Sequence, residues 1–408
     1  MEVVQRTVDK LYKEHFGRLV ASLLYSSRDI DPETAEDIIQ DSFSSALTNW
    51  SAHGIPLNPA GWIYKVCRNK ALDKIAKAKR TEEFTDKTKA ETIEIKFSES
   101  VLEDNQLKLL FACAHPDLAP KVQIVITLKY VVNLRVESIA RILGMTLDGV
   151  DKLLLRARQK IKDEKILLEE PHPSALKPRL AIVHKIIYLI FNEGYKSSWG
   201  KEILREELCE EALILNKTLI DKNLGNKETR ALQALMLFNS ARFKSRFGHD
   251  GELLDLENQD RSLWSNDLIM LACDMLKKSQ SAIVSNYHLE ASIACIHSLS
   301  KSFDETDWNT IANLYAKMLH ENPNPFVEMN YAIALYYAGQ NEKAISILNE
   351  LHQHTFLNQY HLLNATLGKL HHLQGDDILA RKFLSEAYNQ TNFIKEKDFI
   401  QKMIESLK

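Results

Sequence analysis

The chain has 408 residues, a formal net charge of −3 at pH 7, 45% hydrophobic residues and 26% charged residues, which describes an ordinary globular protein with two or more domains. Because the net charge is small, any binding to nucleic acid must come from local basic patches. The five cysteines are scattered with no Cys-x-x-Cys pair, which argues against a disulfide framework and a zinc ribbon and fits a reducing compartment.

The N-terminal segment, residues 5–26, predicts an amphipathic helix. Its apolar stripe consists of Val8, Leu11, Tyr12, His15, Phe16, Leu19 and Val20. The segment has no uninterrupted apolar stretch, so it does not read as a signal peptide, and no later run approaches the length of a membrane span. We therefore expect a cytoplasmic protein with no membrane partner.

Residues 31–50 predict a second helix with a narrow apolar stripe and an acidic start. The stripe consists of Ala35, Ile38, Ile39, Ser42, Phe43, Ala46 and Leu47. The acids around the start are Asp29, Asp31, Glu33, Glu36, Asp37 and Asp41, against Arg28 alone. Acids in a first turn complement the helix dipole, and an acidic helix also suggests a surface for a protein partner.

Residues 58–80 predict a basic amphipathic helix, with Asn58 as N-cap and Pro59 in the first helical position. Its apolar positions are Trp62, Val66, Ala71, Leu72 and Ile75. Its cations are Lys65, Arg68, Lys70, Lys74, Lys77, Lys79 and Arg80, against the single acid Asp73. Such a helix, with Trp62 and Tyr64 near its start, suits phosphate neutralisation and base stacking, although a solvated basic face has the same pattern.

The stretches AEDIIQDSF and GWIYKVCRNKALDKIAKAKR, in this order, resemble region 2 of bacterial sigma factors of the extracytoplasmic-function type. The resemblance implies that the first helix docks on the clamp helices of RNA polymerase and that the second opens and reads the promoter −10 element. It assigns polymerase contacts to Asp37, Gln40 and Asp41. It assigns −10 contacts to Trp62, Lys65, Arg68, Asn69, Lys70 and Lys74. The loop 51–57 would hold a base flipped out of the duplex.

Residues 81–104 lose periodicity and gather Thr, Glu and Lys, so they read as a linker. Beyond it, Leu107, Leu110, Phe111 and Ala114 predict a short apolar helix that ends before His115. Residues 120–133 are rich in β-branched residues, which alone would favour a strand; the flanking pattern and the resemblance to a sigma factor favour a helix.

Residues 136–144 and 147–165 predict a helix-turn-helix, because a short helix closed by Gly144 is followed by a helix that Thr146 can cap. This block resembles region 4 of sigma factors, which reads the −35 element. The candidate −35 contacts are Thr146, Asp148, Asp151, Lys152, Arg156, Arg158 and Lys160.

The start of the proposed recognition helix departs from the usual pattern. Asp148, Gly149 and Asp151 stand where polar or basic residues are usual. Acids repel phosphate, although an aspartate can accept a hydrogen bond from cytosine N4. Alternatively, Asp148 serves only the helix N-terminus.

Pro171, Pro173 and Pro178 are expected to break any helix and to separate a third part, which reads almost entirely helical. Near its end, Gly339, Ala344 and Leu348 recur 36 residues later as Gly375, Ala380 and Leu384. This period and the glycine turns are typical of tetratricopeptide-type helix pairs, which stack into a curved solenoid.

Several stretches of this third part resemble a long helical extension that certain sigma factors of this type carry, whose role is regulatory or interaction-related. These stretches are 189–198, 253–264, 287–298, 306–315 and 324–335. Within them, Asn192 and Glu193 are best explained as helix-capping residues, whereas Asp255, Glu257, Asp260 and Arg261 could form an ion network or a binding edge. His288, Glu290 and the histidines at 352, 354, 371 and 372 lack the pattern of a metal site and are best explained as solvated or core residues.

The sequence thus predicts an all-α protein. Its expected parts are residues 1–80 (region 2), 81–105 (linker), 106–167 (region 4) and 168–408 (a tetratricopeptide-like domain). We expect a sigma factor that directs core RNA polymerase to specific promoters, is not an enzyme and needs no cofactor or metal. Its partners would be core RNA polymerase, promoter DNA and a protein or small ligand of the C-terminal domain.

Two other functions remain open at this point. A stand-alone helix-turn-helix regulator with a sensor domain would bind duplex DNA without polymerase, and it would not need the paired acidic and basic helices. An enzyme hidden in the third part would need residues at catalytic spacing, which the sequence does not offer.

Overall fold

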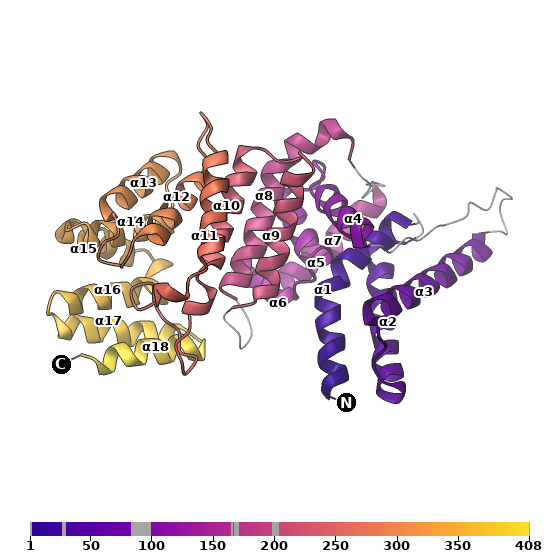
Figure 1. The fold of residues 1–408 in the computed structure, drawn as a ribbon, viewed down its shortest axis with the longest axis horizontal. Helices are drawn as coiled ribbons and strands as arrows, with labels where there is room; N and C mark the ends of the chain where they lie inside the picture. The colour runs from indigo at the N-terminus through magenta and orange to yellow at the C-terminus, as the bar shows by residue number, and fades with distance from the viewer. Residues whose placement is uncertain are drawn as a thin grey trace. The chain divides into compact units, whose positions relative to one another are not determined.

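The fold comes from a computed structural model that describes residues 2–26, 30–82, 99–164, 166, 171–197 and 204–407. Within these residues the regular structure is helical, and the only β-type pairing is an isolated bridge between Phe247 and Leu253 (Figure 1). The prediction of an all-α fold is confirmed. The chain divides into two compact units, Met1–Leu224 and Gly225–Lys408.

The first unit begins with three helices that pack on one another. They are α1 (Glu2–Ser26), α2 (Pro32–His53) and α3 (Pro59–Glu82). Asp31 caps α2 by accepting a hydrogen bond from the Thr34 amide at 2.7 Å. The helix continues to His53, so the predicted loop 51–57 is shorter than expected, and Gly54 ends it with a φ of 85°.

The buried face of α3 agrees with the predicted one at Ala71 and Ile75 and differs from it elsewhere. Ile63, Cys67, Ala71 and Ile75 are buried at every fourth position. Trp62, Val66 and Leu72 are only half-buried, because the closely packed stripe passes through the neighbouring positions 63, 67 and 71.

Four helices come next, and the first of them begins inside the predicted linker 81–105, of which residues 83–98 lie outside the described part. They are α4 (Glu99–Cys113), α5 (Pro120–Tyr130), α6 (Val136–Ile142) and α7 (Leu147–Asp163). The β-branched stretch at 120–133 is therefore helical over most of its length, as predicted. Gly144 turns the chain with a φ of 59°, and the Thr146 hydroxyl accepts from the Gly149 amide at 3.1 Å, which gives the predicted helix-turn-helix.

The same unit also contains α8 (Pro173–Tyr195) and α9 (Glu206–Asp221). The expectation that all three prolines break the helix is wrong for Pro178, which lies inside α8. Pro173 occupies the first position, and Pro178 follows within the second turn, so the helix loses a single backbone hydrogen bond near its start. Helix α8 packs on α4, α5 and α6, so the compact unit extends past the proline-rich segment.

The second unit is a succession of antiparallel helices and short 3₁₀ turns. Its helices are α10 (Lys227–Ser240), α11 (Asn266–Lys278), α12 (Asn286–Leu299), α13 (Trp308–Glu321), α14 (Pro325–Tyr337), α15 (Asn341–His352), α16 (His361–Leu373), α17 (Asp377–Gln390) and α18 (Ile394–Glu405). The 3₁₀ turns are η1 (Phe243–Ser245), η2 (Arg261–Leu263) and η3 (Leu357–Gln359).

The predicted internal repeat corresponds to two helix pairs, α14–α15 and α16–α17 (Figure 1). Gly339 and Gly375 lie between the helices of each pair with φ values of 84° and 83°. In the helix after each glycine, the repeated alanine and leucine are fully buried. They are Ala344 and Leu348 in the first pair and Ala380 and Leu384 in the second, so equivalent positions have equivalent roles. None of the described helices is long and apolar enough to cross a lipid bilayer.

Candidate functional site

The outer face of α2 carries the three predicted polymerase contacts. Asp37, Gln40 and Asp41 are exposed, and their spacing of three and four residues puts them on one face of the helix. On the opposite face, Ile38 and Ile39 are buried against the rest of the three-helix module. One face of the helix is thus packed against the module, and its acidic face is exposed to solvent.

Two acids nearer the start of α2 contact the helix-turn-helix module. Glu36 Oε1 lies 2.7 Å from Lys129 Nζ, and both side chains are mostly buried. Glu33 lies 3.6 Å from Arg158 Nη1, while Arg158 Nε donates to the Tyr130 hydroxyl at 2.7 Å. Burial alone would lower the pKa of Arg158, but Tyr130 and Glu33 outweigh it and raise that pKa. These contacts link α2 to α5 and α7.

The basic surface of α3 is largely accessible. Lys65, Arg68, Asn69 and Lys74 are exposed, and Lys70 is half-buried. The side chains of Lys79 and Arg80 lie outside the described part, although their backbone belongs to α3. The exposed residues recur along consecutive turns, so one helix presents several cations to an extended anionic partner.

Trp62 is held by a second tryptophan. Its ring packs edge-on against the buried Trp50 of α2, with the centroids 5.5 Å apart. The side chain is half-buried, so it presents only part of its ring to solvent. The sequence does not predict this pairing, because the two residues belong to different helices.

The short loop between α2 and α3 exposes apolar side chains that the sequence analysis did not single out. Leu57 is fully exposed, and Ile55 is exposed as well. The sequence did contain a signal for this exposed position, because Leu57 is an isolated apolar residue between Pro56 and Asn58 in a predicted loop. An apolar surface beside a basic helix suits contact with an unstacked base.

At the start of α7, the charge of one acid is compensated by a lysine of the same helix. Asp148 pairs with Lys152 at 2.7 Å, one turn along the helix, while Thr146 provides the N-cap. Asp151 and Arg156 are also exposed. The charge of Asp148 is thus compensated within the helix, which reduces its repulsion of phosphate.

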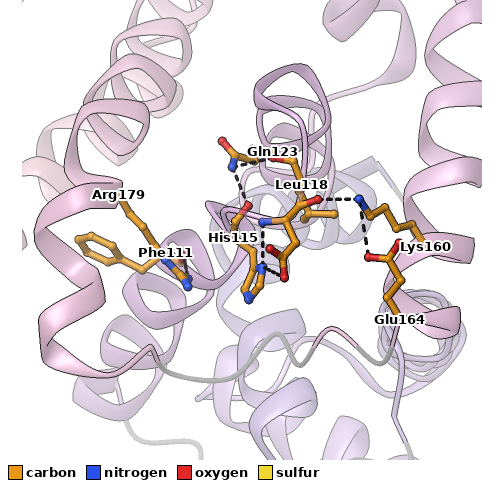
Figure 2. Close-up of polar contacts among 8 residues, drawn as sticks. Phe111, His115, Leu118, Gln123, Lys160, Glu164 and Arg179 are labelled. Atoms are coloured by element: carbon orange, nitrogen blue, oxygen red, sulfur yellow. Dashed lines mark hydrogen bonds and ion pairs between the residues drawn. The ribbon is translucent and has the colours of Figure 1, made fainter.

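Lys160, near the end of α7, already has partners within the protein. Lys160 Nζ donates to the Asp117 carbonyl at 2.7 Å and lies 3.6 Å from Glu164 (Figure 2). Together with Arg158, this lysine holds α7 to the segments before and within α5. Neither cation is free for phosphate in this arrangement.

Hydrogen bonds fix the segment between α4 and α5 (Figure 2). The side-chain amide of Gln123 donates hydrogen bonds to the backbone carbonyls of His115 at 2.6 Å and Leu118 at 2.9 Å. Arg179, at the start of α8, donates to the Phe111 carbonyl at 2.8 Å. Burial, together with the Arg179 charge, lowers the pKa of His115.

The polar motif in residues 191–195 packs two helices together. Glu193 and Gly194 are buried, and a Cβ atom at Gly194 would lie 2.7 Å from the Cys209 sulfur of α9. Asn192 is exposed, and its carbonyl accepts from the Lys196 amide at 2.8 Å at the end of α8. The motif therefore ends α8 and permits α8 and α9 to pack closely.

The acidic stretch near residue 257 contains an ion network, whereas its use as a binding edge stays a prediction. Asp260 caps η2 by accepting from the Ser262 amide at 2.9 Å, and Arg261 donates to the Ser300 carbonyl at 2.8 Å. Asp255 and Glu257 instead bind Lys369 and face a pocket. Of the described residues, no three His, Cys, Asp or Glu side chains gather as metal ligands would.

Comparison with protein families assigns both N-terminal modules. Residues 12–81 match sigma-70 region 2, and residues 108–161 match sigma-70 region 4. The chain belongs to the sigma-70 family. It is a sigma factor of the extracytoplasmic-function-like type with a C-terminal extension, and residues 179–280 of that extension match a family of unknown function (DUF6596).

Two relatives match the chain, and one of them is a sigma factor. The chain is 32% identical over 340 residues to an uncharacterized protein, R00370, of Rhizobium meliloti (strain 1021), which covers 81% of this chain and 80% of the relative. It is 28% identical over 146 residues to the RNA polymerase sigma factor SigV of Bacillus subtilis (strain 168), which covers 36% of this chain and 81% of SigV. No solved structure matches the chain.

The sigma factor acts by binding other macromolecules. Its two sigma modules bind core RNA polymerase and promoter DNA for transcription initiation, and the protein is not an enzyme.

Proposed function

We propose that this sigma factor binds the polymerase clamp through the outer face of α2 and the −10 element through α3 and the loop before it. The supporting observation is that Asp37, Gln40 and Asp41 remain exposed on a helix whose other face is buried. The next helix along the chain exposes Lys65 and Arg68. One compact module thus carries an acidic surface for protein and a basic surface for DNA.

The −10 strand would lie along α3. Lys65, Arg68, Asn69 and Lys74 would neutralise phosphates or hydrogen-bond to bases, with Lys70 at the edge of this surface. Leu57 in the preceding loop would cover the apolar face of a flipped base. Trp62 would support that base by its exposed edge while it stays packed on Trp50.

The −35 duplex would contact α7 through its first turns. Thr146, Asp151, Lys152 and Arg156 are exposed there, which favours them as the residues that reach the major groove. Arg158 and Lys160 would reach phosphates only after they leave Glu33 and Asp117, their partners in the free protein.

Transcription from promoter fragments with purified core RNA polymerase tests the proposal. Asp41→Lys should abolish initiation by removing the polymerase contact, and Arg68→Glu should reduce it about tenfold or more by replacing a phosphate contact with repulsion. The charge reversals Asp9→Lys and Lys13→Glu on the exposed face of α1 serve as matched controls. Full initiation by both α2 and α3 variants would contradict these surfaces.

The C-terminal extension would regulate the two sigma modules or bind a partner. This proposal rests on α8 and α9, which belong to the same compact unit as the sigma modules and connect them directly to the rest of the extension. Initiation by residues 1–224 should therefore differ from initiation by the full chain. Equal activity of the two proteins at every promoter would overturn a regulatory role.

A stand-alone DNA-binding regulator would behave differently in the same experiment. It would bind promoter duplex without polymerase, and Asp41→Lys would leave that binding unchanged. The sigma factor should instead bind specifically only with core polymerase, which would also place its work in the cytoplasm.

A further inference from the structure

The C-terminal unit contains a pocket of about 400 Å³ to which no role has been assigned. Its walls come from α13, α14 and α16, and residues 255–257 border it. The lining is mostly apolar, with a few polar groups. This volume and lining are typical of sites that hold a small molecule.

Aromatic rings form one wall of the pocket. Trp308 and Tyr337 stack with their centroids 4.8 Å apart, and Phe303 packs against both at 4.9 and 4.8 Å. His297 meets Trp308 edge-on at 5.1 Å. Burial, with the charges of Arg242 and Arg261, lowers the pKa of His297 to about 3, so its ring is neutral at physiological pH. The rings that form the wall therefore offer π-electron surface, and the imidazole among them carries no charge of its own.

A charged cluster at the border of the pocket carries an excess of negative charge. Lys369 Nζ lies 2.7 Å from Asp255 and 2.6 Å from Glu257. The ammonium also interacts with the Tyr337 phenol, whose pKa it lowers against the stronger raising effect of burial. Two carboxylates against one ammonium leave a net charge of about −1, and the donors of Lys369 are already used.

Polar groups in the lining have spare hydrogen-bonding capacity. Within the described part of the chain, the side chains of Asn330 and Thr366 form no hydrogen bond, although both line the pocket. These groups could orient a ligand without breaking an existing contact.

We propose that this pocket binds a small organic cation, namely an ammonium or guanidinium group carried on an apolar body. The aromatic wall attracts a cation through its ring quadrupoles, and the carboxylate pair adds attraction. An anion would have to draw Lys369 away from both carboxylates. A neutral apolar molecule would fill the same volume but gain nothing from the charge.

Titration calorimetry of the full-length protein with benzyltrimethylammonium tests the proposal, with phenylacetate and benzyl alcohol as anionic and neutral probes of related shape. Saturable binding of the cation, about tenfold tighter than either other probe, is expected. No binding of the cation, or equal binding of all three probes, would overturn the proposal. The result is independent of promoter activity, so it stands or falls separately from the sigma surfaces.

Charge variants locate the binding. Lys369→Met leaves both carboxylates unpaired and should tighten cation binding about fivefold, whereas the double change Asp255→Asn and Glu257→Gln should abolish it and favour phenylacetate. Trp308→Phe should weaken cation binding because phenylalanine is the weaker π partner. Glu342→Gln, an exposed change of one charge on α15, is the matched control. Thermal unfolding verifies folding of each variant, and unchanged affinities in folded variants would contradict the site.

Discussion

At the scale of single residues, close backbone approaches decide what a position tolerates. Gly17 lies in the middle of α1, where alanine would normally be the better helix former. A Cβ atom there would clash with the carbonyl oxygen of Val131, just after α5. The glycine thus permits the first helix to touch the helix-turn-helix module.

Gly17→Ala should destabilise the free protein by about 2 kcal/mol, because a rigid backbone carbonyl must move. Thermal unfolding of the full chain measures the effect, with Lys13→Ala on the exposed face of α1 as the control. A variant as stable as the control would mean that the two modules do not touch in solution as described.

His297 predicts a specific pH dependence of stability. Its pKa is about 3 in the folded chain, through burial and the nearby arginines, and about 6.5 when unfolded. Below pH 6.5 the unfolded chain therefore binds a proton that the folded chain does not, so stability falls as the pH falls. The loss should reach at most about 2 kcal/mol at pH 5.

His297→Phe keeps a ring beside Trp308 and removes the titrating group. Denaturant unfolding at pH 7 and pH 5 should give a smaller difference for this variant than for the natural protein. The exposed His320→Gln serves as the control. Identical pH profiles for His297→Phe and the natural protein would contradict a buried neutral imidazole.

At the scale of elements, the repeat makes two turns equivalent. Gly339 and Gly375 have nearly the same positive φ, and no atom lies within 4 Å of a Cβ added at either. Only backbone strain should therefore oppose a side chain at these positions.

Gly339→Ala and Gly375→Ala should each lower the free energy of unfolding by about 1 kcal/mol, to a similar extent. Chemical denaturation is the measurement, and Glu342→Ala in the following helix is the control for propensity. A large difference between the two glycine variants would contradict the equivalence of the helix pairs.

At the scale of the whole molecule, the compact unit does not end at the proline-rich segment. Arg179 of α8 bonds to Phe111, and Lys222 after α9 pairs with Asp104 at 2.7 Å. The Gln106 side chain also bonds to Glu211 of α9. These contacts indicate that α8 and α9 cover a surface of the region 4 module.

A chain of residues 1–224 should therefore unfold cooperatively and be more stable than a chain of residues 1–168. The shorter chain exposes the apolar surface of α4 and α5 that α8 buries. Differential scanning calorimetry of both fragments measures the difference. Equal melting temperatures would mean that α8 and α9 add nothing to the sigma modules.

Much of the architecture followed from local sequence signals. Asn58 accepts from the Gly61 amide at 2.9 Å as a predicted N-cap does, and Thr146 starts α7 as expected. Helical periodicity, caps and glycine turns act over a few residues, so the sequence alone determined most of the helices, the helix-turn-helix and the repeat. The β-branched stretch at 120–133 is an exception, because its own composition favours a strand. The candidate surfaces on α2 and α3 depend on the same periodicity, and their roles stay predictions.

Only the tertiary structure decided which side chains are used internally. Trp62 packs on Trp50 of another helix, which the pattern of its own helix does not reveal. Arg158 contacts Tyr130 and Glu33, although the helical pattern alone gives such a cation to solvent or DNA. Lys369 meets Asp255 more than a hundred residues away. Pairings of this kind depend on how distant helices pack, and the period of a single helix carries no information about its neighbours.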